Sequence, residues 1–303
     1  MWTQLWSGLG GKLADRWVAV SGPALVFWLG GIAAYAAGNG LAPLVGLVDR
    51  LSKAALPAQL IWIAVALAAV HASALAVDRC ALPVLRLLEG YWPAWLAKVT
   101  DDRVADLHRR AVAEQAEWQL LAAVPDRSPE QTRRMVRLDE LRRRRPPLDR
   151  LLPTRLGTRM LAAEAAPRVR YGLDAVVVWG HLWLVLPEAT RTELTAARTA
   201  VNRAVAGVVW SALFPLFACW TPWAVPVGIA AVLLIERLWL PVLVDRYAVL
   251  VQAAFDLHRF ALYRAAHWKP PDGPAEELGR GPALTAFLYR GEAPAGLQYQ
   301  HDT

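Results

Sequence analysis

Cysteine, lysine and methionine are scarce in this 303-residue sequence, which has two, four and three of them. Cys80 and Cys219 fall near opposite ends of predicted membrane spans, so the sequence excludes a disulfide between them and supports no cysteine metal site. Arginine supplies 29 of the 33 basic residues. Together with abundant alanine, this bias is typical of a GC-rich bacterial genome, so the arginine content alone does not indicate phosphate binding.

Motifs that carry catalysis are also missing. The six histidines show no paired-ligand spacing, and Ser7–Lys12 has the wrong spacing for a phosphate loop, with no strand before it. No nucleophile elbow, catalytic carboxylate pair or kinase signature appears. The sequence therefore predicts a protein that is not an enzyme and that has no cofactor or metal site.

Apolar residues dominate the chain. They make up 56% of it, 15 residues are tryptophan, and the mean hydropathy is +0.27, which predicts a membrane protein with a sizeable aqueous part. Segments of about 20 apolar residues can cross the ~30 Å hydrocarbon layer as helices. Four segments qualify: Trp17–Ala37, Ala58–Val77, Ala204–Trp220 and Trp223–Val244. The first is long for a signal peptide, so we expect an uncleaved anchor.

The distribution of basic residues predicts the orientation of these spans, because lysine and arginine remain on the cytoplasmic side during insertion. The outer loops hold only Arg50 and Lys53. The opposite ends of the spans are rich in basic residues: Lys12, Arg16, Arg79, Arg86, Arg191, Arg198, Arg203, Arg246, Arg259 and Arg264. We therefore expect a multi-pass protein of the bacterial inner membrane with both termini and residues 78–202 in the cytoplasm.

The predicted fold class is an all-α membrane protein with two membrane hairpins of the same orientation and a mainly helical cytoplasmic domain. Similar sequences at the start and end of the two hairpins fit either a duplication or chance matches in alanine-rich sequence. The apolar run Tyr171–Pro187 is interrupted by charge and is expected to be a buried core element or an interfacial segment. The predicted parts are a first hairpin (1–77), a cytoplasmic domain (78–202), a second hairpin (203–244), a helix continuing span four (245–269) and a flexible tail (270–303).

An adjacent acid and base, Glu236 and Arg237, interrupt the fourth span. Counting from the turn between spans three and four places them at the inner interface as a salt bridge, whereas a later boundary places them inside the hydrocarbon. In the second case they form a functional polar layer with His71 and Ser73. Pro241 removes the backbone hydrogen bond to the Arg237 carbonyl, so it predicts a kink or hinge there.

Four alanines repeat every fourth residue of the second span and share one face of a helix: Ala64, Ala68, Ala72 and Ala76. Small residues at this spacing let helices approach closely, which predicts a packing face. A ring of such faces around an axis would instead form a pore wall. The sequence leaves both alternatives open.

The stretch Leu152–Pro187 contains the pattern Pro, Thr, Arg, Leu, Gly, then an Ala and Glu helix, then Arg, Tyr, Gly, Leu, Asp. On this pattern the chain resembles a group of uncharacterised bacterial proteins with four membrane spans. The resemblance implies the same layout and no known activity. Gly180 and His181 depart from the group, which usually has Pro and Arg there. The polar members of the pattern predict either a network that stabilises the cytoplasmic domain or a ligand or partner site: Arg155, Arg170, Tyr171 and Asp174.

Two functional hypotheses follow. The first is a homo-oligomeric membrane protein with a channel-like core gated through its cytoplasmic domain. The second is a non-catalytic scaffold that recruits a cytoplasmic protein partner, within a system such as defence or stress response. Membrane lipids are expected partners under both hypotheses. Nucleic acid is not expected, because Asp139, Glu140 and Asp149 dilute the basic run Arg142–Arg145.

Overall fold

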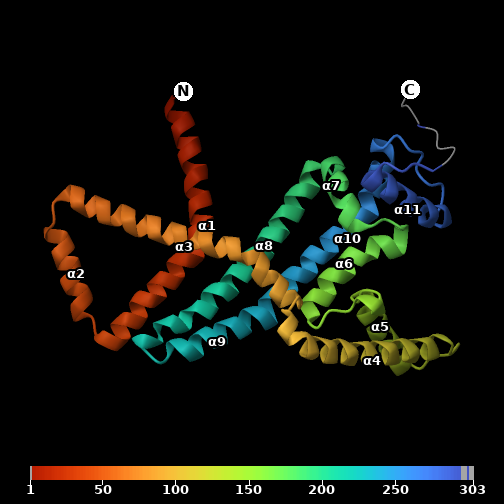
Figure 1. Cartoon of the computed structure of the whole chain (residues 1–303), viewed down its shortest axis with the longest axis horizontal. Coiled ribbons are helices and arrows are strands. Elements are labelled where there is room, and N and C mark those ends of the chain that lie inside the picture. The colour runs from red at the N-terminus through yellow and green to blue at the C-terminus, as the bar shows by residue number, and fades with distance from the viewer. Residues whose placement is uncertain (1, 295–298, 300–303) are drawn as a thin grey trace. The chain divides into compact units, whose positions relative to one another are not determined.

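The computed structural model describes residues 2–294 and 299, with side chains from Ser21 onward (Figure 1). The chain is 84% helical, and its described part contains no strand. The first half contains α1 (Trp2–Asn39), α2 (Ala42–Lys53), α3 (Leu56–Glu89), η1 (Ala94–Leu96), α4 (Ala97–Ala122), α5 (Pro129–Arg143) and η2 (Leu148–Arg150). The second half contains α6 (Arg155–Tyr171), α7 (Ala175–Val185), α8 (Glu188–Leu213), η3 (Phe214–Cys219), α9 (Ala224–Leu234), η4 (Ile235–Trp239), α10 (Leu240–Ala265) and α11 (Pro274–Arg290).

Four helices are long and apolar enough to cross a membrane, which confirms the all-α class and the number of candidate spans. They lie in α1 from Ser21, in α3, in α8 with η3, and in α9 through α10. A finding that the sequence analysis missed is α2, a 12-residue helix between the first two spans, where only a loop was expected. The apolar helix α7 has 11 residues, about 17 Å at the helical rise, and is too short to span the bilayer.

The chain divides into two compact units. Unit 1 takes the chain up to Leu85 together with Asn202–Pro241, and unit 2 takes Arg86–Val201 together with the chain from Val242 onward. Unit 1 has an aromatic core in which the Phe27 ring lies 4.7 Å from that of Trp210 and 4.9 Å from that of Phe217. A Cβ at Gly31 would lie 2.4 Å from the Phe217 ring, so glycine is what lets this ring approach α1.

Unit 2 has its core around α7, which confirms that the run Tyr171–Pro187 contains a buried element. Val178 and Leu182 of α7 are completely buried against α10 and α11. The helix begins after Asp174, whose side chain accepts a hydrogen bond from the Val176 backbone amide at 3.0 Å. This cap satisfies one of the free amides of the first turn.

Helix ends in unit 2 follow local signals. Ser128 and Gln131 form a capping box at the start of α5, with hydrogen bonds of 3.2 and 2.9 Å. Helix α3 ends at Glu89, directly before Gly90, whose φ of 102° favours glycine. Helix α10 ends at Ala265 rather than continuing to Pro270, because His267 adopts a φ of 57°.

The expectation of a flexible tail over residues 270–303 is wrong for its first part. Pro274–Arg290 forms α11, in which Leu284 is completely buried against the core of unit 2 and Glu277 is 4% exposed. Helix α11 is buried by its contacts with α6, α7 and α10. The glycine and proline content of the tail gives no sign of these contacts.

Candidate functional site

A sharp turn at the end of α6 directs Arg170 and Tyr171, two polar residues of the Leu152–Pro187 pattern, towards α10. Gly172 ends the helix with a φ of 69°, and its amide donates to the Arg168 carbonyl at 3.1 Å. The amide of Leu173 reaches back to the Pro167 carbonyl at 3.3 Å. Glycine is required at this position by its backbone conformation and by the close approach of α11.

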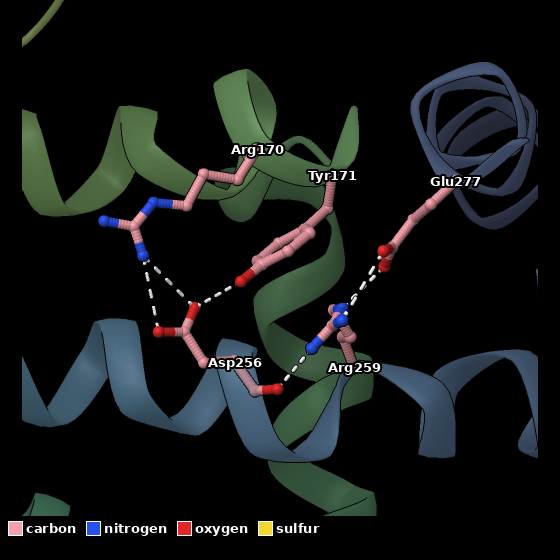
Figure 2. A network of polar contacts seen from close by, with 5 residues as sticks. All are labelled: Arg170, Tyr171, Asp256, Arg259 and Glu277. Carbon is pink, nitrogen blue, oxygen red and sulfur yellow. Dashed lines mark hydrogen bonds and ion pairs between the residues drawn. The ribbon is translucent and has the colours of Figure 1, made fainter. Parts of the chain in front are cut away.

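Both side chains meet on one carboxylate (Figure 2). The Tyr171 hydroxyl donates to Asp256 Oδ1 at 2.6 Å, and Arg170 Nη1 lies 3.3 Å from Asp256 Oδ2. Arg170 is largely exposed, whereas Tyr171 is half-buried. Burial, followed by the hydrogen bond to Asp256 and the negative charge of Asp256, raises the pKa of the Tyr171 hydroxyl above its ordinary value.

A second ion pair lies beside the first and is more deeply buried. Arg259 Nε donates to Glu277 Oε1 at 2.5 Å, and the two side chains are 16% and 6% exposed. The guanidinium of Arg259 also bonds the backbone carbonyl of Asp256 and lies 4.2 Å from the Tyr171 ring centroid. Arg259 therefore connects α10 to α11 and to the end of α6, as Figure 2 shows. We call these five residues the α6–α10–α11 network: Arg170, Tyr171, Asp256, Arg259 and Glu277.

The structure does not bring the four polar residues of the Leu152–Pro187 pattern together in one place. Asp174 caps α7, and its backbone amide donates to Thr285 Oγ1 of α11 at 3.2 Å, so it lies near the network without joining it. Arg155 is the exposed first residue of α6. It lies 15 residues before Arg170, about 22 Å along the helix, so the expectation of one site containing all four residues is wrong for Arg155.

In comparisons with known proteins, no family model, no curated protein and no solved structure matches this chain.

Each charged side chain of the α6–α10–α11 network is paired with another one in the chain. The network therefore favours stabilisation of the unit 2 fold over ligand binding, because its carboxylates are already occupied by arginines. In the described part of the chain, no group of three or more His, Cys, Asp or Glu side chains is placed to hold a metal ion.

The four residues of the predicted polar layer in the membrane also fall into two separate groups. Ser21 Oγ, which is completely buried, lies 2.9 Å from His71 Nδ1, and Trp28 Nε1 donates to Ser73 Oγ at 3.1 Å. His71 and Ser73 are thus held by hydrogen bonds to α1. Glu236 and Arg237 are exposed, and among the described residues no hydrogen bond or ion pair includes their side chains.

Both residues lie in η4, a π-helical segment in which the Leu240 amide bonds the Ile235 carbonyl five residues back. Pro241 follows directly and has no amide to offer the Arg237 carbonyl, which explains why the regular pattern fails here. This is the position at which the sequence predicts a hinge. It is also where the chain passes from unit 1 to unit 2.

The small-residue face of α3 is exposed along its whole length: Ala64, Ala68, Ala72 and Ala76. The same helix buries a different face inside the chain, formed by Ala74, Val77, Ala81 and Leu85. Among the residues that the structure describes, the alanine face is therefore not used for packing within one chain.

Sequence reasoning missed Asp256, Arg259 and Glu277. Asp256 pairs with residues 85 and 86 positions away, and no sequence spacing links them. The sequence Asp-Leu-His-Arg occurs twice, starting at Asp106 and at Asp256, and this repeat was the available signal for Asp256 and Arg259.

Proposed function

We propose that the chain is a homo-oligomeric protein of the bacterial inner membrane with a channel-like core. Its four spans form two hairpins of the same orientation, and unit 2 lies in the cytoplasm together with both termini. Four apolar helices of sufficient length and the one-sided distribution of basic residues support this arrangement.

The proposal of an oligomer rests on the exposure of α3. Only 11% of its most apolar stretch is buried inside the chain, and the exposed part includes the alanine face. In lipid, helices associate through close packing of small residues, since apolar burial alone gives no advantage over lipid tails. A second copy is the partner that these alanines fit, either packed directly or arranged around an axis.

Helix continuity supports coupling between the proposed pore and unit 2. Helix α8 is unbroken from Glu188 to Leu213, and α9, η4 and α10 follow one another without a loop from Ala224 to Ala265. A rotation of unit 2 can therefore be transmitted along rigid helices, with the π segment before Pro241 as the point of local adjustment.

Cysteine cross-linking tests the oligomer. In a background with Cys80→Ser and Cys219→Ser, Ala68→Cys is expected to form disulfide-linked dimers in membranes. Ala66→Cys is the matched control, because Ala66 is also exposed but lies about 200° around the helix. Equal cross-linking at both positions, or none at Ala68, would contradict the proposal.

Bilayer recordings test conduction. Purified wild-type protein is expected to give ion currents that Ala68→Trp alters and Ala66→Trp leaves unchanged. Absence of current from wild-type protein under all tested voltages and salts would refute the channel while leaving the oligomer standing.

The second candidate is a scaffold that binds a cytoplasmic protein. It is favoured by exposed apolar side chains on α4 and α5, which lie alongside each other in Figure 1: Val112, Leu120, Val136 and Leu141. A partner recovered in stoichiometric amount with wild-type protein and lost with Leu120→Glu would support it. A channel that conducts without any such partner would count against it.

A further inference from the structure

Unit 2 contains a pocket between α7, α8 and α10 that the proposed function does not use. Its volume is about 460 Å³, within the usual range for small-molecule sites. Its walls are mainly apolar and include three aromatic rings: Trp179 and Trp183 come from α7, and Tyr247 comes from α10. The two indole rings lie 6.0 Å apart.

One cation faces this aromatic space. Arg198 of α8 is half-buried, and its guanidinium lies 5.6 Å from the Tyr247 ring centroid. Its charge acts on the Glu89 carboxylate, but within the described residues no hydrogen bond or ion pair includes its side chain. Arg259 and the neighbouring Arg246 differ, because Arg259 pairs with Glu277 and Arg246 lies 3.6 Å from Glu193. Thr195 and Thr199, one helical turn apart, add hydroxyl groups to the same wall. An Arg with free donors beside hydroxyls and rings fits an anionic group attached to an apolar body.

The position along the chain indicates where such a ligand comes from. Arg198 precedes the predicted start of span three at Ala204 by six residues, about 9 Å along a helix, and Tyr247 follows the predicted end of span four at Val244 by three. Tryptophan, tyrosine and arginine at this depth are the side chains typical of the lipid head-group region.

We propose that this pocket binds one anionic phospholipid of the inner leaflet, with its phosphodiester on Arg198 and the threonine hydroxyls and its glycerol and upper acyl chains against the aromatic rings. The inference rests on the proposed topology, which places the pocket at the cytoplasmic membrane surface. It adds a specific ligand to that topology and does not depend on conduction.

The test uses native mass spectrometry of the full-length protein in detergent with added phosphatidylglycerol or phosphatidylcholine. Wild-type protein is expected to retain one phosphatidylglycerol in clear preference to phosphatidylcholine. Arg198→Met is expected to weaken phosphatidylglycerol binding about tenfold or more, as for loss of a hydrogen bond to a charged group. Arg246→Met is the control, because it removes an adjacent exposed charge outside the pocket and is expected to change the affinity less than about twofold.

A second variant tests the pocket without removing a charge. A Cβ at Gly180, which lines the pocket on α7, meets no atom within 4 Å, and the helical backbone there accommodates a side chain such as Leu. Gly180→Leu is therefore expected to fill the pocket, preserve the fold and abolish the preference for phosphatidylglycerol. Gly180→Ala is expected to have a smaller effect.

Three results would overturn the proposal: no preference for phosphatidylglycerol, equal binding by wild type and Gly180→Leu, or displacement of the lipid by an equal concentration of inorganic phosphate. The last result would identify a site for a soluble anion. Failure of this test leaves cross-linking at Ala68 and the currents unaffected, so it is distinguishable from failure of the proposed function.

Discussion

Replacing Glu277 by Gln is expected to weaken the packing of α11 against the rest of unit 2. The substitution keeps the size of the side chain but leaves Arg259 as a buried cation without its carboxylate. Removal of one member of a buried ion pair costs about 3–5 kcal/mol. Arg259 keeps its bond to the Asp256 carbonyl and its contact with the Tyr171 ring, so we expect a smaller loss of about 2–3 kcal/mol, at or just below the lower limit of that range.

Amide hydrogen exchange of the full-length protein in detergent measures this loss directly. Since about 1.4 kcal/mol corresponds to a factor of ten, amides of Pro274–Arg290 are expected to exchange about 30- to 150-fold faster in the Glu277→Gln variant. Amides of α5, which does not contact α11 through this network, are expected to keep their wild-type rates.

Glu276→Gln is the matched control. Glu276 is the adjacent residue and pairs with Arg280, but both side chains are more than a third exposed. An exposed pair contributes about 1 kcal/mol or less, so exchange in α11 should rise less than about fivefold. Replacing both Arg259 and Glu277 by Met should give slower exchange than Glu277→Gln alone, because no unpaired charge remains. Equal and small effects of Glu277→Gln and Glu276→Gln would refute the assignment of Arg259–Glu277 as the contact that holds α11.

Three further outcomes are expected. Gly281→Ala should destabilise unit 2 by about 1–3 kcal/mol in thermal unfolding, because its Cβ would lie 2.0 Å from the Tyr171 carbonyl oxygen. Gly279→Ala, where nothing lies within 4 Å, should stabilise α11, and the reverse order would be inconsistent with the docking of α11. Ser128→Ala should cost about 1 kcal/mol and speed exchange at the start of α5 several-fold, whereas unchanged exchange there would rule out the capping box as a stabilising feature. Because its pKa is raised in the fold, neutral Tyr171 contributes stability that is complete below about pH 10 and is lost as the pH rises further. The melting temperature of wild type should therefore fall more steeply above pH 10 than that of Tyr171→Phe, and parallel curves would argue against this contribution.

The features that were predictable are those in which neighbouring residues determine the structure. Ser128, Pro129 and Gln131 lie within four positions and define the start of α5, and Gly90 marks the end of α3 because few other residues adopt its backbone conformation. The four spans follow from hydrophobic length alone.

The features that were missed depend on contacts between distant residues. Glu277 is an ordinary surface residue by sequence, yet it is buried because Arg259 neutralises it. From the sequence alone, Gly281 is expected to weaken a helix, yet it is the residue that lets α11 lie against the Tyr171 carbonyl. The pocket at Arg198 likewise combines side chains from three helices, so no local pattern marks it.

The central claim is the topology, with unit 2 in the cytoplasm, and accessibility of single cysteines in intact bacterial cells tests it most directly. In the Cys80→Ser and Cys219→Ser background, Arg143→Cys places a thiol at an exposed position of α5, and Gly46→Cys places one on exposed α2 in the proposed outer connection. With a membrane-impermeant thiol reagent, we predict labelling of Gly46→Cys in intact cells and of Arg143→Cys only after the membrane is opened. Labelling of Arg143→Cys in intact cells would contradict the account.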